Sequence, residues 1–259
     1  MSNSKLAALK AAFEKKNTGS GTGDQTWKLK YPFWKMEDGA VATVRFLPDL
    51  NESNDLGFLV ENLTHELVVN GKKQTVACAS MHGERCPICD LARKYYDEEG
   101  DGSLNGKKYY RKKSYIGQVL VIDSPIEHDQ DQLVKLIEFG PQVYKQIQAA
   151  FQSGDLDEAP YEMKGGYNFR FRKTKTGSGQ NSYTTSNFAP KQTDLEDEII
   201  EALKLFNLND YRAPKMAAEA LEAMLIAEQT GAAFSDDSSS SAPQTPAEKP
   251  TASESVSTP

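Results

Sequence analysis

The sequence predicts a mixed α+β protein with one main domain, in which a small β-barrel or β-sandwich is followed by helices. At 259 residues the chain can bury one good core, whereas a second full domain would be crowded. Between residues 27 and 190, short apolar segments are broken by Gly, Pro, Asn and Asp, which is typical of short strands. After residue 191 the apolar residues return to helical spacing.

The N-terminal segment, residues 4–16, is predicted to form a short basic amphipathic helix. Leu6, Leu9 and Phe13 fall on one helical stripe. The basic residues around the stripe are Lys5, Lys10, Lys15 and Lys16. Residues 17–23 have the composition of a flexible linker, so the stripe must dock on another surface. The segment lacks the uninterrupted apolar stretch of a signal peptide, and we expect no membrane association and a cytosolic location.

The central part contains five segments with the composition of strands and two predicted helices. The strand segments are WKLKYPFW (27–34), AVATVRFLP (40–48), LGFLVENLT (56–64), YIGQVLVID (115–123) and YNFRFRKTK (167–175). The predicted helices cover residues 90–96 and 142–151.

The C-terminal part is predicted to be helical and then disordered. Thr193 and Glu196 have the spacing of a capping box, and Pro214 and Gly231 bracket a further helix. The stripe that follows the capping box is Leu195, Ile199, Leu203 and Phe206. Residues 235–259 are rich in Ser and Pro and too poor in apolar residues to offset the entropy of ordering, which predicts a disordered tail.

The net charge of −7 hides an uneven distribution. Residues 192–259 carry thirteen acidic and four basic side chains, a balance of −9, so residues 1–191 carry +2. A polyanionic partner is therefore compatible with the first part of the chain, although the total charge argues against one.

The three cysteines predict a metal site. An odd number of cysteines cannot all pair within one chain, and a reducing cytosol would keep the thiols reduced. Cys86 and Cys89 are separated by two residues, so both sulfurs can reach one tetrahedral zinc ion, and Cys78 provides a third ligand. The alternative is that the three cysteines are small buried apolar residues.

The fourth ligand is either His65 or His82. We prefer His65, because Asn70-Gly71 lies between it and Cys78 and is a strong hairpin signal that would bring the two together. His128, beside two acidic residues, is interpreted as an ordinary surface histidine.

A catalytic zinc is less consistent with the spacing than one structural Zn²⁺. His82-Gly83-Glu84 followed by the cysteine pair is superficially similar to zinc deaminases, but only one residue separates the two halves. Four protein ligands also leave no position for an activated water. Residues 176–180 do not form a P-loop, and no nucleophile with a catalytic partner is evident, so we predict no enzyme activity.

Two stretches combine cations with aromatic rings, which is the composition that a sequence-tolerant binder of single strands requires. The first comprises Lys107, Lys108, Tyr109, Tyr110, Arg111, Lys112, Lys113 and Tyr115. The second comprises Lys164, Arg170, Arg172, Lys173 and Lys175, followed by Tyr183 and Phe188. Cations would follow the phosphates and rings would stack on bases. The alternative is a pair of solvated strand edges.

The combination of motifs resembles the single-stranded-DNA-binding, helix-destabilising proteins of T-even-type bacteriophages. The residues that carry the resemblance are Trp27-Lys28-Leu29-Lys30, Arg45-Phe46-Leu47-Pro48, the set His65, Cys78, Cys86-Pro87-Ile88-Cys89, Arg111-Lys112-Lys113-Ser114-Tyr115 and Phe139-Gly140. The order of these motifs and the cysteine and histidine spacing are specific, and the similarity covers most of the chain.

This resemblance implies an OB-fold-like β-barrel core with a zinc-binding subdomain and flanking helices, forming a cleft for single-stranded DNA. It also implies three regions: a basic arm (1–23) that binds a neighbouring copy along the strand, a DNA-binding core (24–234) and a C-terminal tail (235–259). The C-terminal region would contact phage replication and recombination proteins in the cytoplasm of an infected bacterial host. The remaining alternatives are a zinc-ribbon adaptor that binds proteins and a metal-dependent nuclease or deaminase.

Overall fold

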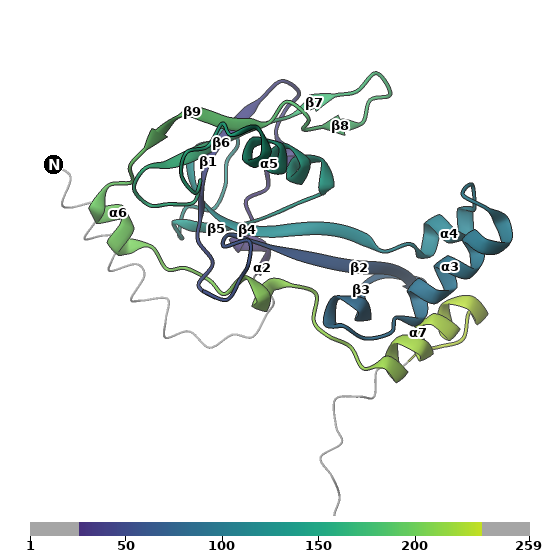
Figure 1. The fold of residues 1–259 in the computed structure, drawn as a ribbon. Helices are drawn as coiled ribbons and strands as arrows, with labels where there is room; N and C mark the ends of the chain where they lie inside the picture. Colours follow the sequence, from purple (N-terminus) through teal and green to yellow (C-terminus); the bar gives the residue numbers. More distant parts are fainter. Residues whose placement is uncertain (1–25, 235–259) are drawn as a thin grey trace, which may run out of the picture.

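The computed structural model describes residues 26–234 and has the predicted mixed α+β architecture. A curved antiparallel sheet forms the body, and helices lie at its ends (Figure 1). The predicted helix at 4–16 with its four lysines, the linker 17–23 and the tail 235–259 lie outside the described residues. No helix within residues 26–234 is both long enough and apolar enough to cross a membrane.

The segment predicted as the first strand is not a strand, and this prediction was wrong. It forms a short helix, α2 (Thr26–Leu29), and a 3₁₀ helix, η1 (Phe33–Lys35). Only Lys30, between them, makes a single β-bridge, to Leu136. Pro32 has no N–H to donate to a ladder, so pairing cannot continue past it.

The sheet contains seven strands, and the segments predicted at 40–48, 56–64, 115–123 and 167–175 are confirmed as strands. Its order is β3-β2-β4-β1-β6-β9, with β5 paired to β4. The strands are β1 (Val41–Leu47), β2 (Leu59–Val69), β3 (Lys72–Ala77), β4 (Lys112–Asp123), β5 (Val134–Phe139), β6 (Gly166–Arg172) and β9 (Asn187–Thr193). A separate hairpin pairs β7 (Thr174–Lys175) with β8 (Asn181–Ser182).

Strand β4 connects the two ends of the molecule. Its first half, residues 112–117, pairs with β2, and its second half, residues 118–123, pairs with β1. β5 pairs with residues 115–120 and so overlaps both halves. Figure 1 shows β2 and β4 running from the sheet body toward α3, α4 and α7.

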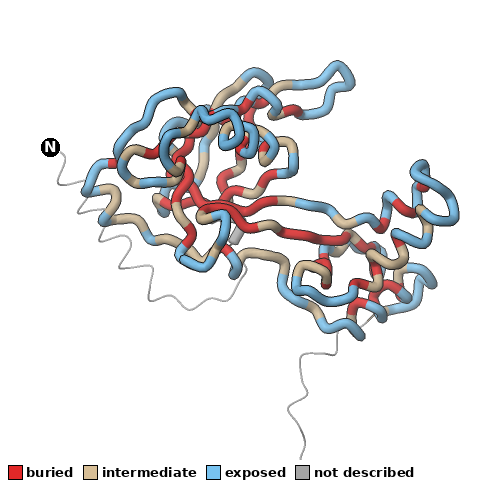
Figure 2. Tube along the Cα trace, viewed as in Figure 1, coloured by how far each residue is buried: buried red, intermediate tan, exposed pale blue. Residues whose placement is uncertain are grey.

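The main core is aromatic and follows the alternation of the strands. Phe46 of β1 and Phe169 and Phe171 of β6 point inward, where they pack with Phe139 and Phe188. The strands carry the longest buried stretches of the chain (Figure 2). Burial alternates clearly along β6, whereas β2 and β4 have continuous buried runs, so the strand segments were recognisable from their apolar composition and from the turn residues that bound them.

Helix α5 (Pro141–Ser153) covers one end of this core, as the sequence predicts. Pro141 occupies the first turn, where a missing N–H costs nothing, and Gly154 ends the helix with a φ of 74°. Val143 and Ile147 are its buried residues.

A second cluster lies at the far end of β2. The hairpin predicted at Asn70-Gly71 is present: Val69 pairs with Lys72, and the two turn residues have φ values of 54° and 72°. Positive φ at both positions is what a two-residue type I′ hairpin turn requires. Helices α3 (Pro87–Glu99), which includes the predicted 90–96, α4 (Leu104–Tyr109) and α7 (Ala218–Thr230) complete this end.

The capping box predicted at Thr193 and Glu196 is wrong. Thr193 is the last residue of β9, and its carbonyl and hydroxyl oxygens both accept hydrogen bonds from the buried Arg45 guanidinium. The helix that follows, α6 (Asp197–Ala202), is short and has no side-chain cap. The expected apolar stripe still packs, with Leu195 buried and Ile199 and Leu203 partly buried beside it.

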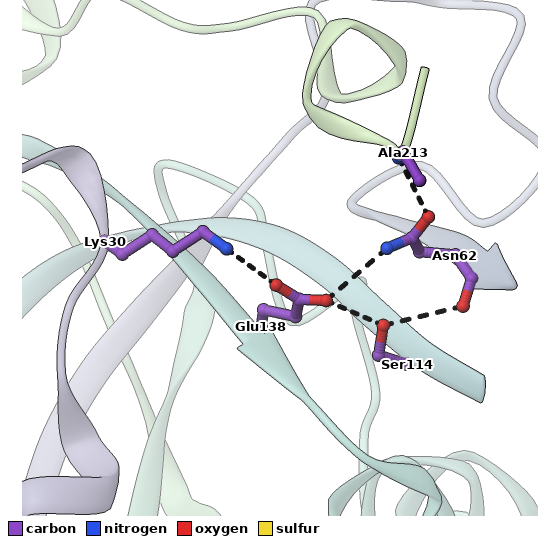
Figure 3. Close-up of polar contacts among 5 residues, drawn as sticks. All are labelled: Lys30, Asn62, Ser114, Glu138 and Ala213. Atoms are coloured by element: carbon purple, nitrogen blue, oxygen red, sulfur yellow. Dashed lines mark hydrogen bonds and ion pairs between the residues drawn. The ribbon is translucent and has the colours of Figure 1, made fainter. Parts of the chain in front are cut away.

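The chain then crosses the sheet as an extended segment with one 3₁₀ turn, η3 (Leu208–Tyr211), before α7. Figure 3 shows how the end of this segment is attached: the Asn62 Oδ1 accepts the N–H of Ala213 at 3.0 Å. Glu138 accepts hydrogen bonds from Asn62, Ser114 and Lys30, the last at 2.7 Å. Burial raises the pKa of Glu138, but the Lys30 ammonium and these hydrogen bonds together lower it by more. The pKa of Glu138 is therefore below its ordinary value.

Candidate metal centre and nucleic-acid interface

Four residues from three parts of the chain form a cluster of metal-ligating atoms. His65 lies in β2, Cys78 follows β3, and Cys86 and Cys89 lie at the N-terminus of α3. The β2–β3 hairpin pairs His65 with Val76, which brings it close to Cys78. The structure therefore places together the four ligands predicted from sequence, whereas His82 is exposed and outside the cluster.

The distances fit a tetrahedral ion. His65 Nε2 lies 3.4 Å from Cys86 Sγ and 3.5 Å from Cys89 Sγ, and Cys78 Sγ lies 3.4 Å from Cys89 Sγ. All four atoms lie within 4.8 Å of one another. A tetrahedral zinc bound by sulfur at 2.3 Å and nitrogen at 2.0–2.1 Å requires ligand separations of about 3.6–3.8 Å. The donor set of three cysteines and one histidine is also one that structural zinc sites use.

Residues that surround the cluster contact its candidate ligands and orient them. The Nδ1 of His65 lies 2.9 Å from the carbonyl oxygen of Tyr109, so a proton on Nδ1 would leave Nε2 free to bind a metal. Cys78 Sγ lies 3.0 Å from Ser80 Oγ, and that hydroxyl also accepts a hydrogen bond from Arg111 Nη1 at 3.1 Å. The cluster thus contacts Tyr109 of the first basic stretch directly and Arg111 through Ser80.

The cluster perturbs the ionisation of its members. Burial would lower the pKa of His65, but contacts with the sulfurs of Cys78 and Cys86 raise it to about 9. Hydrogen bonds from Cys86 and Cys89 hold the pKa of Cys78 well below its usual range. Contacts with Cys78 and Cys86 raise the pKa of Cys89, so the three thiols do not ionise alike. A bound cation would favour the thiolate form of all three, because the thiolate is the form of cysteine that binds metals.

The first basic stretch spans α4 and the start of β4, and three of its five cations are paired with acids from other elements. Lys108 contacts the buried Glu228 of α7 at 2.9 Å. Lys112 contacts Glu66 and Lys113 contacts Glu61 at 2.6 Å, both acids lying on β2. Lys107 is exposed. These acids were not anticipated from sequence, since the pairs join distant segments.

The second basic stretch lies elsewhere in the sheet. Arg170 and Arg172 are exposed on β6, whereas Lys173 is buried and donates to the carbonyl oxygens of Trp34 and Met36. Lys173 is therefore committed to the fold and does not provide a free cation. In the sheet register, Thr43 of β1 lies between Arg170 of β6 and Asp123 of β4. Asp123 is the last residue of β4 and Lys112 is the first, so Arg170 lies near the opposite end of β4 from Lys112. The two predicted stretches are separated along the sheet.

The predicted stacking rings differ in exposure. Tyr110 is 57% exposed and packs edge-on against Tyr96. Tyr109 is buried against Tyr95, and Phe188 is buried beside Phe169, so neither presents a ring face to a ligand in this structure. These two were predicted from local composition, which does not distinguish a core ring from a surface one.

Two further residues of the predicted set are partly or fully covered, and each has an aromatic neighbour that sequence reasoning missed. Tyr115 is buried under Tyr144 of α5, with ring centroids 3.8 Å apart and planes 3° apart. Tyr183 is half-buried and packs edge-on against Phe33, whose neighbour Trp34 is 44% exposed. Tyr144 follows the buried Val143 in a helix, and Trp34 was assigned to a strand, so neither gave a local signal of a binding role.

Comparison with known proteins decides the family. Residues 38–229, well over half of the chain, match the family described as gp32 DNA binding protein like. The chain belongs to this family. The matched range includes all four residues of the metal-ligating cluster and the first basic stretch.

Curated relatives in the gp32-like family come from two bacteriophages. The chain is 28% identical over 208 residues to the single-stranded DNA-binding protein of Enterobacteria phage T2, a match that covers 76% of this chain and 64% of that protein. It is 27% identical over 211 residues to the single-stranded DNA-binding protein of Enterobacteria phage T4, covering 77% and 67%. The match thus spans just under two thirds of the T2 protein.

Proposed function

We propose that this protein binds single-stranded DNA without sequence preference and without catalysing a reaction. The observation that carries the proposal is the link between the metal-ligating cluster and the first basic stretch. Tyr109 contacts His65 through its carbonyl, and Arg111 reaches Cys78 through Ser80. A metal bound there would fix the position of cations that follow the phosphates of a strand. Membership of the gp32-like family supports the same function.

We propose that the cluster holds one structural Zn²⁺. His65, Cys78, Cys86 and Cys89 would fill all four positions of a tetrahedral ion, which leaves none for a reactive water. The ion would supply a rigid crosslink between β2, the end of β3 and α3. We further propose that the antiparallel body of the chain is an OB-fold-like barrel, a fold whose surfaces bind oligonucleotides.

The proposed binding surface uses Lys107, Lys108, Arg111, Lys112 and Lys113 for phosphates, with Tyr110 and Tyr144 for bases. The phosphates of an arriving strand would replace the carboxylates that pair with Lys108, Lys112 and Lys113 in the DNA-free protein. Arg170 and Arg172 would contact a different part of a longer strand, since they lie at the other end of β4. Backbone contacts of this kind carry little sequence information.

The carboxylate of Glu66 is expected to compete with DNA, since it contacts both Lys73 and Lys112. Hydrogen bonds from Lys112 and Lys73 lower the pKa of Glu66. Exposed ion pairs contribute about 0.2–1 kcal/mol, so Glu66→Gln should strengthen binding of single-stranded DNA by up to about five-fold. Fluorescence anisotropy with a labelled oligonucleotide measures the change. Glu52→Gln removes the same charge in an exposed loop, and an equal gain in both variants would contradict a local role.

We also propose the wider roles that the family resemblance implies. The arm at residues 1–23, with Lys5, Lys10, Lys15 and Lys16, would bind a neighbouring copy along the strand and make binding cooperative. Residues 24–234 would form the DNA-binding core, and the tail at 235–259 with the acidic region before it would bind phage replication and recombination proteins. The protein would act in replication, recombination and repair of phage DNA in the cytoplasm of an infected bacterial host.

Gel-shift competition tests this proposal against its main alternative, a zinc-ribbon adaptor that binds proteins. A labelled single strand is challenged with unlabelled single-stranded DNA, the same sequence as duplex, and RNA. The proposal predicts that single-stranded DNA displaces the label well before the duplex, because a duplex hides the base faces. No shift with any nucleic acid would favour the adaptor.

A further inference from the structure

A surface pocket of about 450 Å³ opens where β4 runs into the loop at residues 124–133. Part of its wall is apolar and is formed by Leu120, Ile122, Ile126 and Leu133. Ile122 on this wall is 46% exposed, so its side chain is accessible to a docking segment. The pocket lies at the opposite end of β4 from the first basic stretch.

The rim of this pocket is acidic. Asp123 lines the pocket, and Glu127, Asp129 and Asp131 are exposed carboxylates of the same loop that alternate along the chain with its lining residues; these four acids are called the rim below. Lys135 also lines the pocket, but its ammonium group donates to the carbonyl oxygen of Lys28 at 3.3 Å. Such a rim would repel phosphates and attract a basic amphipathic segment, because an apolar floor and an acidic edge complement an apolar stripe flanked by lysines.

The chain's own N-terminal arm has this chemistry and is attached beside the pocket. Residues 4–16 carry the stripe Leu6, Leu9 and Phe13 among four lysines. The described chain begins at Thr26, and the Lys28 carbonyl contacts Lys135 of the pocket wall. Nine residues, 17–25, separate this segment from Thr26, and a nine-residue chain with the composition of a flexible linker would have a root-mean-square span of roughly 15–18 Å. The stripe itself would be about 10 Å long on a helix.

We propose that residues 4–16 dock in the pocket of the same chain, with the apolar stripe against Ile122 and the lysines toward the acidic rim. A short flexible tether gives an effective concentration on the order of millimolar, which favours the attached arm over that of a second copy. Docking within the chain competes with the contact between neighbouring copies proposed above. This inference does not depend on DNA binding, since it concerns the free protein.

Photo-crosslinking of the full chain tests the proposal. Phe13 is replaced by photoreactive p-benzoylphenylalanine, and equal amounts of isotopically light and heavy protein are mixed and irradiated without DNA. Mass spectrometry should find crosslinks to residues 120–133 in which both peptides carry the same isotope. Mixed-isotope crosslinks at this segment would assign the pocket to a second copy and overturn the proposal. Crosslinks elsewhere, or none, would overturn it as well.

A charge variant tests the acidic rim. Combining Asp123→Asn, Glu127→Gln and Asp129→Asn should lower the yield of the same-isotope crosslink several-fold. The matched control combines Glu52→Gln, Asp55→Asn and Asp97→Asn, which removes three exposed charges away from the pocket and should leave the yield unchanged. Equal yields in the two variants would contradict docking through the rim. Ile122→Gln, at an exposed position, should also lower the yield, and circular dichroism verifies that each variant is folded.

Discussion

Removal of the proposed zinc ion is expected to unfold the end of the molecule that contains α3 and α4 and to abolish tight binding of single-stranded DNA. Four candidate ligands from β2, the end of β3 and α3 meet at the cluster, which contacts Tyr109 directly and Arg111 through Ser80. Structural zinc contributes roughly 10–16 kcal/mol of apparent binding free energy in small zinc-binding peptides, which exceeds the effect of ordinary substitutions. Far-ultraviolet circular dichroism and thermal melting, with and without a chelator, measure the loss.

Two histidine variants distinguish the effect of losing the metal from non-specific destabilisation by a substitution. His65→Ala should lose the ion, with zinc content falling from one per chain to nearly none, and should reproduce the effect of the chelator. His82→Ala is the matched control, because His82 is exposed and lies outside the cluster. Acid should release the ion, since bound thiolates and imidazole must be deprotonated. An unchanged melting temperature after complete metal removal would refute a structural role.

Replacement of the cations at the start of β4 is expected to have the second largest effect. Combining Arg111→Gln, Lys112→Gln and Lys113→Gln removes three phosphate contacts. Each contact adds about −0.7 to the slope of log affinity against log salt, so the slope should become shallower by about 2 and affinity at 0.15 M salt should fall roughly 50-fold. The loss should be similar for all sequences, because phosphates carry no base information. Fluorescence anisotropy at several salt concentrations measures both quantities.

The control for this variant removes the same charge elsewhere. Lys72, Lys94 and Lys191 are exposed and lie outside the proposed surface, so changing all three to Gln should alter the slope much less. If both triple variants lose affinity equally, binding depends on net charge and not on the start of β4.

Much of the fold was predictable because short apolar segments bounded by turn residues indicate strands, and because helices have recognisable ends. The segments around β1, β2, β4 and β6, the Asn70-Gly71 hairpin and the helix that ends at Gly231 all carry local signals. The strand predicted at residues 27–34 was wrong because Pro32 has no N–H to donate to a neighbouring strand. The capping box predicted at Thr193 was wrong because the guanidinium of Arg45, which is distant in sequence, donates hydrogen bonds to the oxygens of Thr193. Tertiary contacts of this kind override a local motif.

The candidate site was predictable where its chemistry is local. Ligand spacing and one hairpin were enough to choose His65 over His82. The ion pairs of Lys108 with Glu228 and of Lys112 with Glu66 could not be predicted, because they depend on how distant elements pack. The same limitation applies to the buried Lys173 and Phe188, which look like surface residues from composition alone.

Fluorescence titration of the metal-loaded protein with an oligothymidine single strand, repeated across a series of salt concentrations, tests the central claim most directly. The account predicts binding in dilute buffer, with log affinity falling linearly against log salt at several multiples of −0.7. An affinity that is independent of salt, or no binding even in dilute buffer, would contradict it.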